Sequence, residues 1–191
     1  MKKFFTCLLM AILFSIGLIA SSATDGSEDK ILFQSGYGYS WIHNKVNGFN
    51  TEQSISYLPF KHWSFGVEVG LGKGNKDKSE MENTFMSKRI YSYLSVGPLV
   101  SYFPIRTCHH NVYISASVNY MHDEEENLLG TSGNEKVTQY WMSFKNDHIA
   151  PSLALGYYYD VYKGFGIGVK AKGTYCNDIR LTMLFNMSFS F

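Results

Sequence analysis

A two-residue alternation of side-chain type occupies the last eleven residues, LTMLFNMSFSF. Apolar residues take every odd position from Leu181 to Phe191, small polar residues take most of the even positions, and Leu184 departs from the pattern. A period of two places successive side chains on opposite faces of a β-strand. We therefore expect the chain to end in a strand with one apolar face and one polar face.

The same alternation recurs upstream in WSFGVEVGLGKG, NVYISASVNYMH, HIAPSLALGYYYDV and GFGIGVKAKG. No stretch after the first 23 residues shows the 3.6-residue period of an amphipathic helix. The pattern therefore predicts eight strands, at residues 31–43, 51–58, 63–73, 89–102, 112–122, 147–161, 165–175 and 181–191.

The connections between these strands differ in length in a regular order. Those after the second, fourth and sixth strands are compact: LPFKHW, FPIRTCHHN and YKG. Those after the first, third and fifth are longer and more polar, although the final link, CNDI, is short. Short periplasmic turns and longer extracellular loops are typical of outer-membrane barrels. We therefore predict an all-β fold, an eight-stranded antiparallel up-and-down transmembrane β-barrel with both termini periplasmic.

A soluble β-sandwich also alternates, so the composition of the second face matters. That face carries Gly, Ser, Ala and Tyr with few charges, which suits the narrow interior of a small closed barrel. Aromatic residues make up 16% of the chain and charged residues 17%. Aromatics stand at the ends of the apolar face, as interfacial girdles do; they are Trp41, Trp63, Tyr102, Tyr157, Tyr159, Phe165, Tyr175 and Phe191.

The first 23 residues, MKKFFTCLLMAILFSIGLIASSA, have the three parts of a secretory signal. Two lysines precede an apolar stretch that is short for a membrane helix, and the small residues Ser21-Ser22-Ala23 follow it. We expect residues 1–23 to be a cleaved signal peptide and residues 24–191 to be the barrel domain. Loss of the two lysines takes the formal charge from +1 to −1, which offers no electrostatic basis for binding nucleic acid.

Four segments make the chain resemble the small eight-stranded outer-membrane barrels of the OmpA/OmpX type: LTMLFNMSFSF, SFGVEVGLG, YLSVGPLVSYF and APSLALGYYYD. The resemblance covers essentially the whole mature chain and implies an outer-membrane location, surrounded by outer-membrane lipid. It also implies that the last strand, with Phe189 and Phe191, is the signal read by the barrel-assembly machinery. It implies no activity, because this scaffold hosts many functions.

Parity places six charged side chains inside the predicted barrel. An eight-stranded barrel is just wide enough to be filled by its own side chains. We expect internal ion pairs, with Glu68 and Lys170 as members, because unpaired buried charges are costly; a narrow gated pore is the alternative. The six residues are Glu52, Glu68, Asp160, Lys170, Lys172 and Arg180.

A lipid-modifying enzyme, resembling a lipid A deacylase or acyltransferase, would need a serine, a histidine and a carboxylate in mutual reach. His122 precedes Asp123, but Ser117 lies on the other face of the same strand. Cys108, His109 and His110 lack an evident fourth metal ligand. We therefore expect no catalytic site, no metal and no cofactor.

Two further features test the predicted topology. Cys108 and Cys176 fall at opposite ends of the barrel, so they are too far apart for a disulfide within one chain. Pro98 and Pro151 fall inside predicted strands, where each removes a ladder donor. A β-bulge at either proline would accommodate it.

The segment VTQYWMSF indicates that the fifth and sixth strands extend beyond the membrane. Tyr140, Trp141 and Phe144 would then lie on an exposed hairpin whose open edge can add strands from a partner. The acidic run DEEEN before it reads as a solvated surface. We expect a monomer with a structural or surface-interaction, adhesion-like role, contacting an extracellular partner through its long loops.

Overall fold

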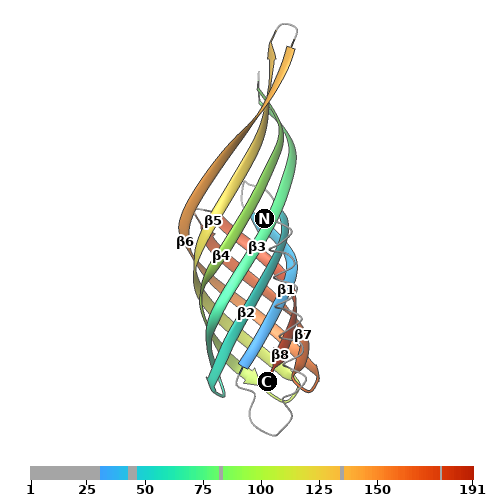
Figure 1. Ribbon diagram of the computed structural model, residues 1–191. Coiled ribbons are helices and arrows are strands. Elements are labelled where there is room, and N and C mark those ends of the chain that lie inside the picture. Colours follow the sequence, from blue (N-terminus) through green and yellow to red (C-terminus); the bar gives the residue numbers. More distant parts are fainter. Residues whose placement is uncertain (1–30, 43–46, 82–83, 134–135, 177) are drawn as a thin grey trace.

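The computed structural model describes residues 31–42, 47–81, 84–133, 136–176 and 178–191. Each strand pairs antiparallel with its sequence neighbours and β1 pairs with β8, which confirms the predicted closed eight-stranded barrel (Figure 1). None of the described residues forms a helix long and apolar enough to cross a bilayer. The strands are β1 (Ile31–Ile42), β2 (Gly48–Phe60), β3 (Trp63–Met81), β4 (Thr84–Arg106), β5 (His110–Gly133), β6 (Lys136–Tyr162), β7 (Phe165–Cys176) and β8 (Asp178–Ser190).

The alternation in the sequence decides which side chains face the interior. On β8, Leu181 and Met183 are more than half exposed, at 56% and 59%, whereas Thr182 and Asn186 are buried. Leu184, which breaks the alternation, is also buried, facing β1 where Gly36 and Gly38 pair with Asn186 and Leu184. A Cβ atom at Gly36 would lie 3.3 Å from Leu184 Cβ. The interior accepts an apolar residue here because the two neighbouring residues of β1, Gly36 and Gly38, carry no side chains.

The four middle strands are longer than predicted. They contain 19, 23, 24 and 27 residues, so the expected loops at 74–88 and 123–146 are largely strand. Pairing continues to Met81↔Thr84 between β3 and β4, and to Gly133↔Lys136 between β5 and β6. The prediction of a loop at 74–88 was wrong, because polar and charged residues can continue a ladder in water. The prediction from VTQYWMSF that the fifth and sixth strands extend further is confirmed.

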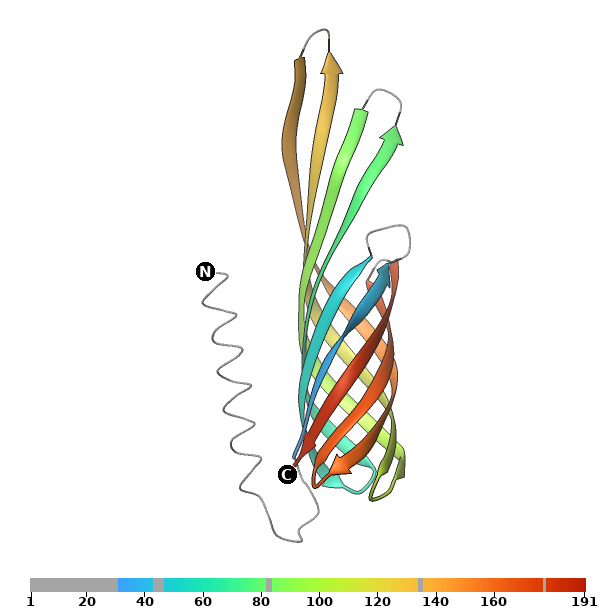
Figure 2. The same ribbon diagram turned by 90° about the vertical axis from the view of Figure 1, so that its right-hand side faces the viewer.

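These strands rise beyond the rest of the wall as a sheet of four strands (Figure 2). Pairing of β3 with β2 ends at Gly74, and pairing of β6 with β7 ends at Ser152. We call this sheet the extension; it comprises residues 75–81, 84–90, 123–133 and 136–151. Its two outer strands, β3 and β6, each have one neighbour in place of two.

Neither proline sits in a bulge, so each is accommodated in another way. Pairs on either side of Pro98, Val96↔Tyr120 and Leu99↔Ser117, keep one register between β4 and β5, and Pro98 itself is bridged to β3. Pro151 pairs with β5, and the β6–β7 ladder begins one residue later. The backbone N–H that each proline lacks therefore falls where no ladder bond is needed: the β4–β5 ladder is interrupted at Pro98, and the β6–β7 ladder has ended before Pro151.

The two cysteines behave as the topology requires. Cys108 is exposed in the turn between β4 and β5, Cys176 is buried at the end of β7, and the two form no disulfide. The prediction that they do not pair is confirmed.

Candidate functional site

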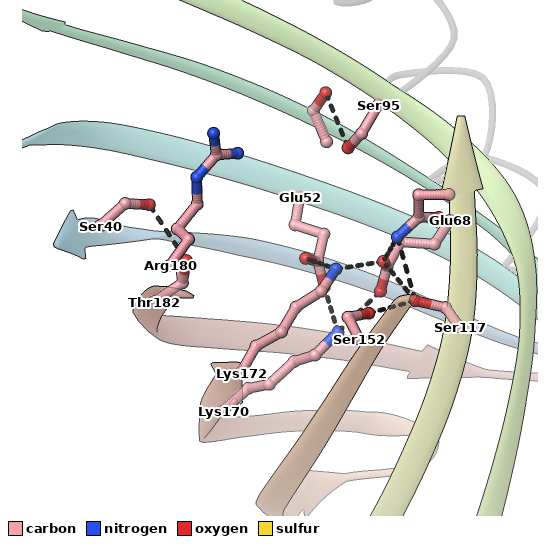
Figure 3. Close-up of polar contacts among 12 residues, drawn as sticks. Ser40, Glu52, Glu68, Ser95, Ser117, Ser152, Lys170, Lys172, Arg180 and Thr182 are labelled. Atoms are coloured by element: carbon pink, nitrogen blue, oxygen red, sulfur yellow. Dashed lines mark hydrogen bonds and ion pairs between the residues drawn. The ribbon is translucent and has the colours of Figure 1, made fainter. Parts of the chain in front are cut away.

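Four of the six predicted interior charges converge in the middle of the barrel (Figure 3). Lys170 and Lys172 extend from β7 towards Glu52 on β2 and Glu68 on β3. Lys170 Nζ lies 3.0 Å from Glu68 Oε2, and Lys172 Nζ lies 2.6 Å from Glu52 Oε2. Each lysine also contacts the other glutamate. All four side chains are at most 7% exposed, so these ion pairs are enclosed.

Uncharged groups complete this cluster, which we call the mid-lumen cluster. Ser117 Oγ and Asn119 Nδ2 of β5 each donate to Glu68 Oε1 at 3.2 Å. Ser117 also bonds Ser152 of β6 at 2.5 Å. Two carboxylates balance two ammonium groups, and hydrogen bonds saturate the acceptors, which is the arrangement that makes buried charge tolerable. The cluster joins opposite walls of the barrel and fills the middle of its interior.

Arg180 belongs to a second group, nearer the extension. Its Nη2 donates to Tyr91 Oη at 2.5 Å, and its guanidinium carbon lies 3.8 Å from the centroid of the Tyr93 ring. Asp123 is a looser partner, with Oδ1 at 3.9 Å from Arg180 Nη2. Asp160 lies near the other end of the barrel, where it accepts a hydrogen bond from Asn111 Nδ2 at 2.7 Å. Neither Arg180 nor Asp160 joins the mid-lumen cluster.

The partners of Arg180 were not predicted from the sequence. Asp123 begins the run DEEEN, for which we predicted a solvated surface, yet it is 6% exposed and faces the interior. The signal was present, because Asn119 and Met121 share its parity on β5 and are also buried. Extending the alternation by one residue pair would have placed Asp123 inside.

A histidine–carboxylate pair lies on the outer face, and its acid is not the residue next to His122 in the sequence. His122 Nδ1 is 2.6 Å from Asp147 Oδ1 of β6, rather than being oriented by Asp123. This hydrogen bond holds the pKa of Asp147 below its ordinary value. Ser117 is buried in the lumen, bonded to Glu68, so it cannot join His122 in a triad.

Metal ligation finds no support in the described part of the chain, where no group of three or more His, Cys, Asp or Glu side chains is arranged to hold an ion. His110, which follows the turn between β4 and β5, instead bonds Tyr157 Oη through Nδ1 at 3.0 Å. His109 lies 5.8 Å from the Tyr159 ring, centroid to centroid. These histidines pack on aromatic side chains of β6.

The predicted contact residues lie on β6 in the extension. Trp141 and Phe144 are 54% and 46% exposed. Tyr140 pairs with Leu129 of β5, and its side chain lies outside the described residues. From Lys136 to Pro151, β6 is hydrogen-bonded to β5 and has no second strand among the described residues. This segment, which we call the β6 edge, is the longest unpaired strand edge in the described structure.

The predicted assembly-signal residues lie at the seam that closes the barrel. Phe189 packs between Phe33 and Phe165, with ring centroids at 6.3 and 5.1 Å. Phe191 exchanges both backbone hydrogen bonds with Ile31, at 2.8 and 3.0 Å. Recognition of these residues by the assembly machinery stays a prediction.

No family model matches the sequence, and no curated protein matches it. Solved structures do match the fold. Neisserial surface protein A shares 13% identity with a TM-score of 0.58, over 87% of this chain and 100% of that one. The attachment invasion locus protein Ail of Yersinia pestis shares 13% identity with a TM-score of 0.51, over 86% and 99%. The chain therefore has the fold of small eight-stranded outer-membrane β-barrels.

Proposed function

We propose that this protein is a monomeric outer-membrane barrel that contacts an extracellular partner through the β6 edge and performs no catalysis. Residues 1–23 direct export and are removed, and both termini lie in the periplasm. The outer face supports insertion in lipid, because Leu153, Leu155 and Val169 are more than half exposed there. Rings such as Trp63 and Tyr157 stand where the apolar face meets water.

The observation that carries the proposal is the exposed β6 edge. Unpaired backbone donors and acceptors along a strand form a template for another strand, and natural proteins usually cover such an edge or break it with charge. Here the edge presents Trp141, Met142 and Phe144 in succession, exposed by 54%, 38% and 46%. Backbone bonds to an added strand would supply affinity, and these side chains would supply selectivity.

Cross-strand pairs keep the extension ordered without a partner. Lys145 Nζ lies 3.3 Å from Glu124 Oε1, and Ser143 Oγ donates to the same oxygen at 3.4 Å. On the other face, Arg89 Nη2 lies 2.7 Å from Glu125 Oε1 and Arg89 Nε donates to Asn127. These contacts join β4, β5 and β6, so the edge is presented in one conformation and binding costs little ordering entropy.

The test measures adherence of cells that express the protein to surfaces coated with serum or matrix proteins. Trp141→Lys together with Phe144→Lys places charge on the β6 edge, and we expect adherence to fall at least tenfold. Leu128→Lys is the matched control. Leu128 lies on β5, inside the sheet, directly opposite Trp141 of β6, so the change adds a lysine away from the unpaired edge. Removal of residues 124–144 should abolish adherence while the barrel still folds. Wild-type adherence by the edge variant would contradict the proposal.

An open pore is the first rival role, and the interior disfavours it. The mid-lumen cluster and Arg180 fill the barrel, and Arg180 and Glu68 are each 1% exposed. We expect no steady single-channel conductance in planar bilayers. Conductance that changes with Glu68→Gln would establish the pore instead.

Lipid modification is the second rival role. The pairs His122–Asp147 and His148–Asp123, at 2.6 and 3.5 Å, are the residues on which such chemistry would have to depend. We expect overexpression to leave the lipid A profile unchanged in mass spectra. A changed profile that His122→Ala or His148→Ala abolishes would overturn the non-catalytic assignment.

A further inference from the structure

A small cavity lies in the lumen between the mid-lumen cluster and Arg180. Its volume is about 10 Å³, and Glu52, Lys172, Tyr93 and Arg180 are among the residues around it. A polar cavity of this size holds one water molecule, provided that two to four polar partners surround it. The cavity therefore lies between the mid-lumen cluster and Arg180, both of which are labelled in Figure 3.

Three buried polar atoms on the residues around this cavity have no hydrogen-bond partner among the described residues: Asn50 Oδ1, Asn119 Oδ1 and Arg180 Nε. The three side chains are 4%, 1% and 1% exposed, so bulk solvent does not reach them. A buried polar atom left unsatisfied costs about 1–3 kcal/mol. The residues around the cavity thus carry two unsatisfied acceptors and one unsatisfied donor, contributed by β2, β5 and β8.

We propose that the cavity is a binding site for a single structural water molecule. Water can donate one hydrogen to each asparagine oxygen and accept the Arg180 Nε–H, which satisfies all three atoms at once. A metal ion or ammonium cannot accept from Arg180, and it would meet two cationic neighbours, Arg180 and Lys172. An anion cannot donate to the two amide oxygens. The donor and acceptor pattern fits water and excludes these ions.

The bound water makes one network of two groups. Arg180 donates to the water, the water donates to Asn119 Oδ1, and Asn119 Nδ2 donates to Glu68 Oε1 at 3.2 Å. Because Arg180 also donates to Tyr91, the hydrogen-bonded chain runs from β4 near the extension to the lysines of β7. The interior is then a single continuous plug.

The test uses nuclear magnetic resonance of the full mature chain in detergent micelles. We expect cross-relaxation between the Arg180 Nε–H proton and a long-lived water, and its loss in Asn50→Leu, which removes one acceptor and fills the cavity. Asn186→Leu is the matched control, because Asn186 is a buried lumen asparagine bonded to Tyr113, away from this cavity. It should leave the signal intact.

A crystal structure of the unmodified protein gives an independent result, so a variant that fails to fold leaves the proposal testable. We expect density for one water within about 3.2 Å of all three atoms, the limit for such hydrogen bonds. Absence of both the density and the cross-relaxation would overturn the proposal, and so would a signal that persists in Asn50→Leu.

Discussion

The barrel and the extension are built from the same strands, yet they treat charge and strand edges in opposite ways. Inside the barrel, Lys170 and Glu68 are 3% and 1% exposed and are held by several partners. In the extension, Lys145 and Glu124 form a pair of similar length with 62% and 35% exposure. Closure is what differs: it encloses the charges and gives every strand two neighbours, whereas the extension leaves its charges in water and two edges free.

The largest loss of folding stability should come from breaking the mid-lumen cluster. Glu68→Leu leaves one lysine charge without a counter-charge, and removing one partner of a buried pair costs about 3–5 kcal/mol. Adding Lys170→Met removes the excess charge and should restore most of that loss, since Glu52 and Lys172 still pair. Urea unfolding in micelles measures both variants. Equal stability of Glu68→Leu and wild type would show that the cluster does not support the barrel.

The matched change in the extension is Glu124→Leu. It removes the partner of Lys145 in water, where such pairs contribute about 0–1 kcal/mol. We expect the urea midpoint to stay within error of the wild-type value. A loss of stability comparable to that of Glu68→Leu would mean that enclosure by the closed barrel does not explain why the two ion pairs differ in their contribution.

The next effect concerns the outer face. Leu153 is 67% exposed on the part of β6 that is paired on both sides. Leu153→Arg should cost up to about 2–4 kcal/mol, the largest cost of arginine on the lipid face. Trp141→Arg, on the same strand in the extension, should change stability by less than about 0.5 kcal/mol. Refolding into phospholipid vesicles measures the stability of both variants. Similar costs would mean that Leu153 and Trp141 lie in the same environment, which would contradict the distinction between barrel wall and extension.

The smallest expected effect is on the titration of the Asp147 carboxyl, which lies at the base of the extension. His122 lowers the pKa of Asp147, so the folded state binds this proton less readily than the unfolded state. The pair therefore adds stability above the unfolded pKa of Asp147, and that contribution is lost as the pH falls through the lower folded pKa. Carbon-13 shifts of the carboxyl should titrate below the ordinary value of 3.8, and His122→Ala should raise the midpoint towards it. An unchanged midpoint would contradict this assignment.

Strand number and facing could be read from the sequence because both follow from local alternation, whereas closure was inferred from the small residues of the second face. Parity placed Glu52, Glu68, Lys170 and Lys172 on the lumen side, where they are buried. Strand ends were the weak point. Alternation stops being visible when both faces of a sheet are wet, so β5 was ended at His122 although it continues to Gly133.

Partners across the lumen could not be derived in the same way. Lys170 meets Glu52 and Glu68 at separations of 118 and 102 residues. Which side chains meet there depends on the stagger of the closed sheet, a global property that no local pattern carries. The cavity beside Asn50 has the same origin, because its walls come from several strands.

The extension also has a mechanical consequence. Its strands continue into the barrel, where β5 stays bridged to β4 down to Arg106↔Asn111 and β6 to β7 down to Tyr162↔Phe165. A pull on the tip of the β5–β6 hairpin, directed away from the barrel, acts along those ladders and loads their hydrogen bonds in parallel. Tension is then shared by many bonds rather than opening them one at a time, so the hairpin is anchored as a tether that resists shear.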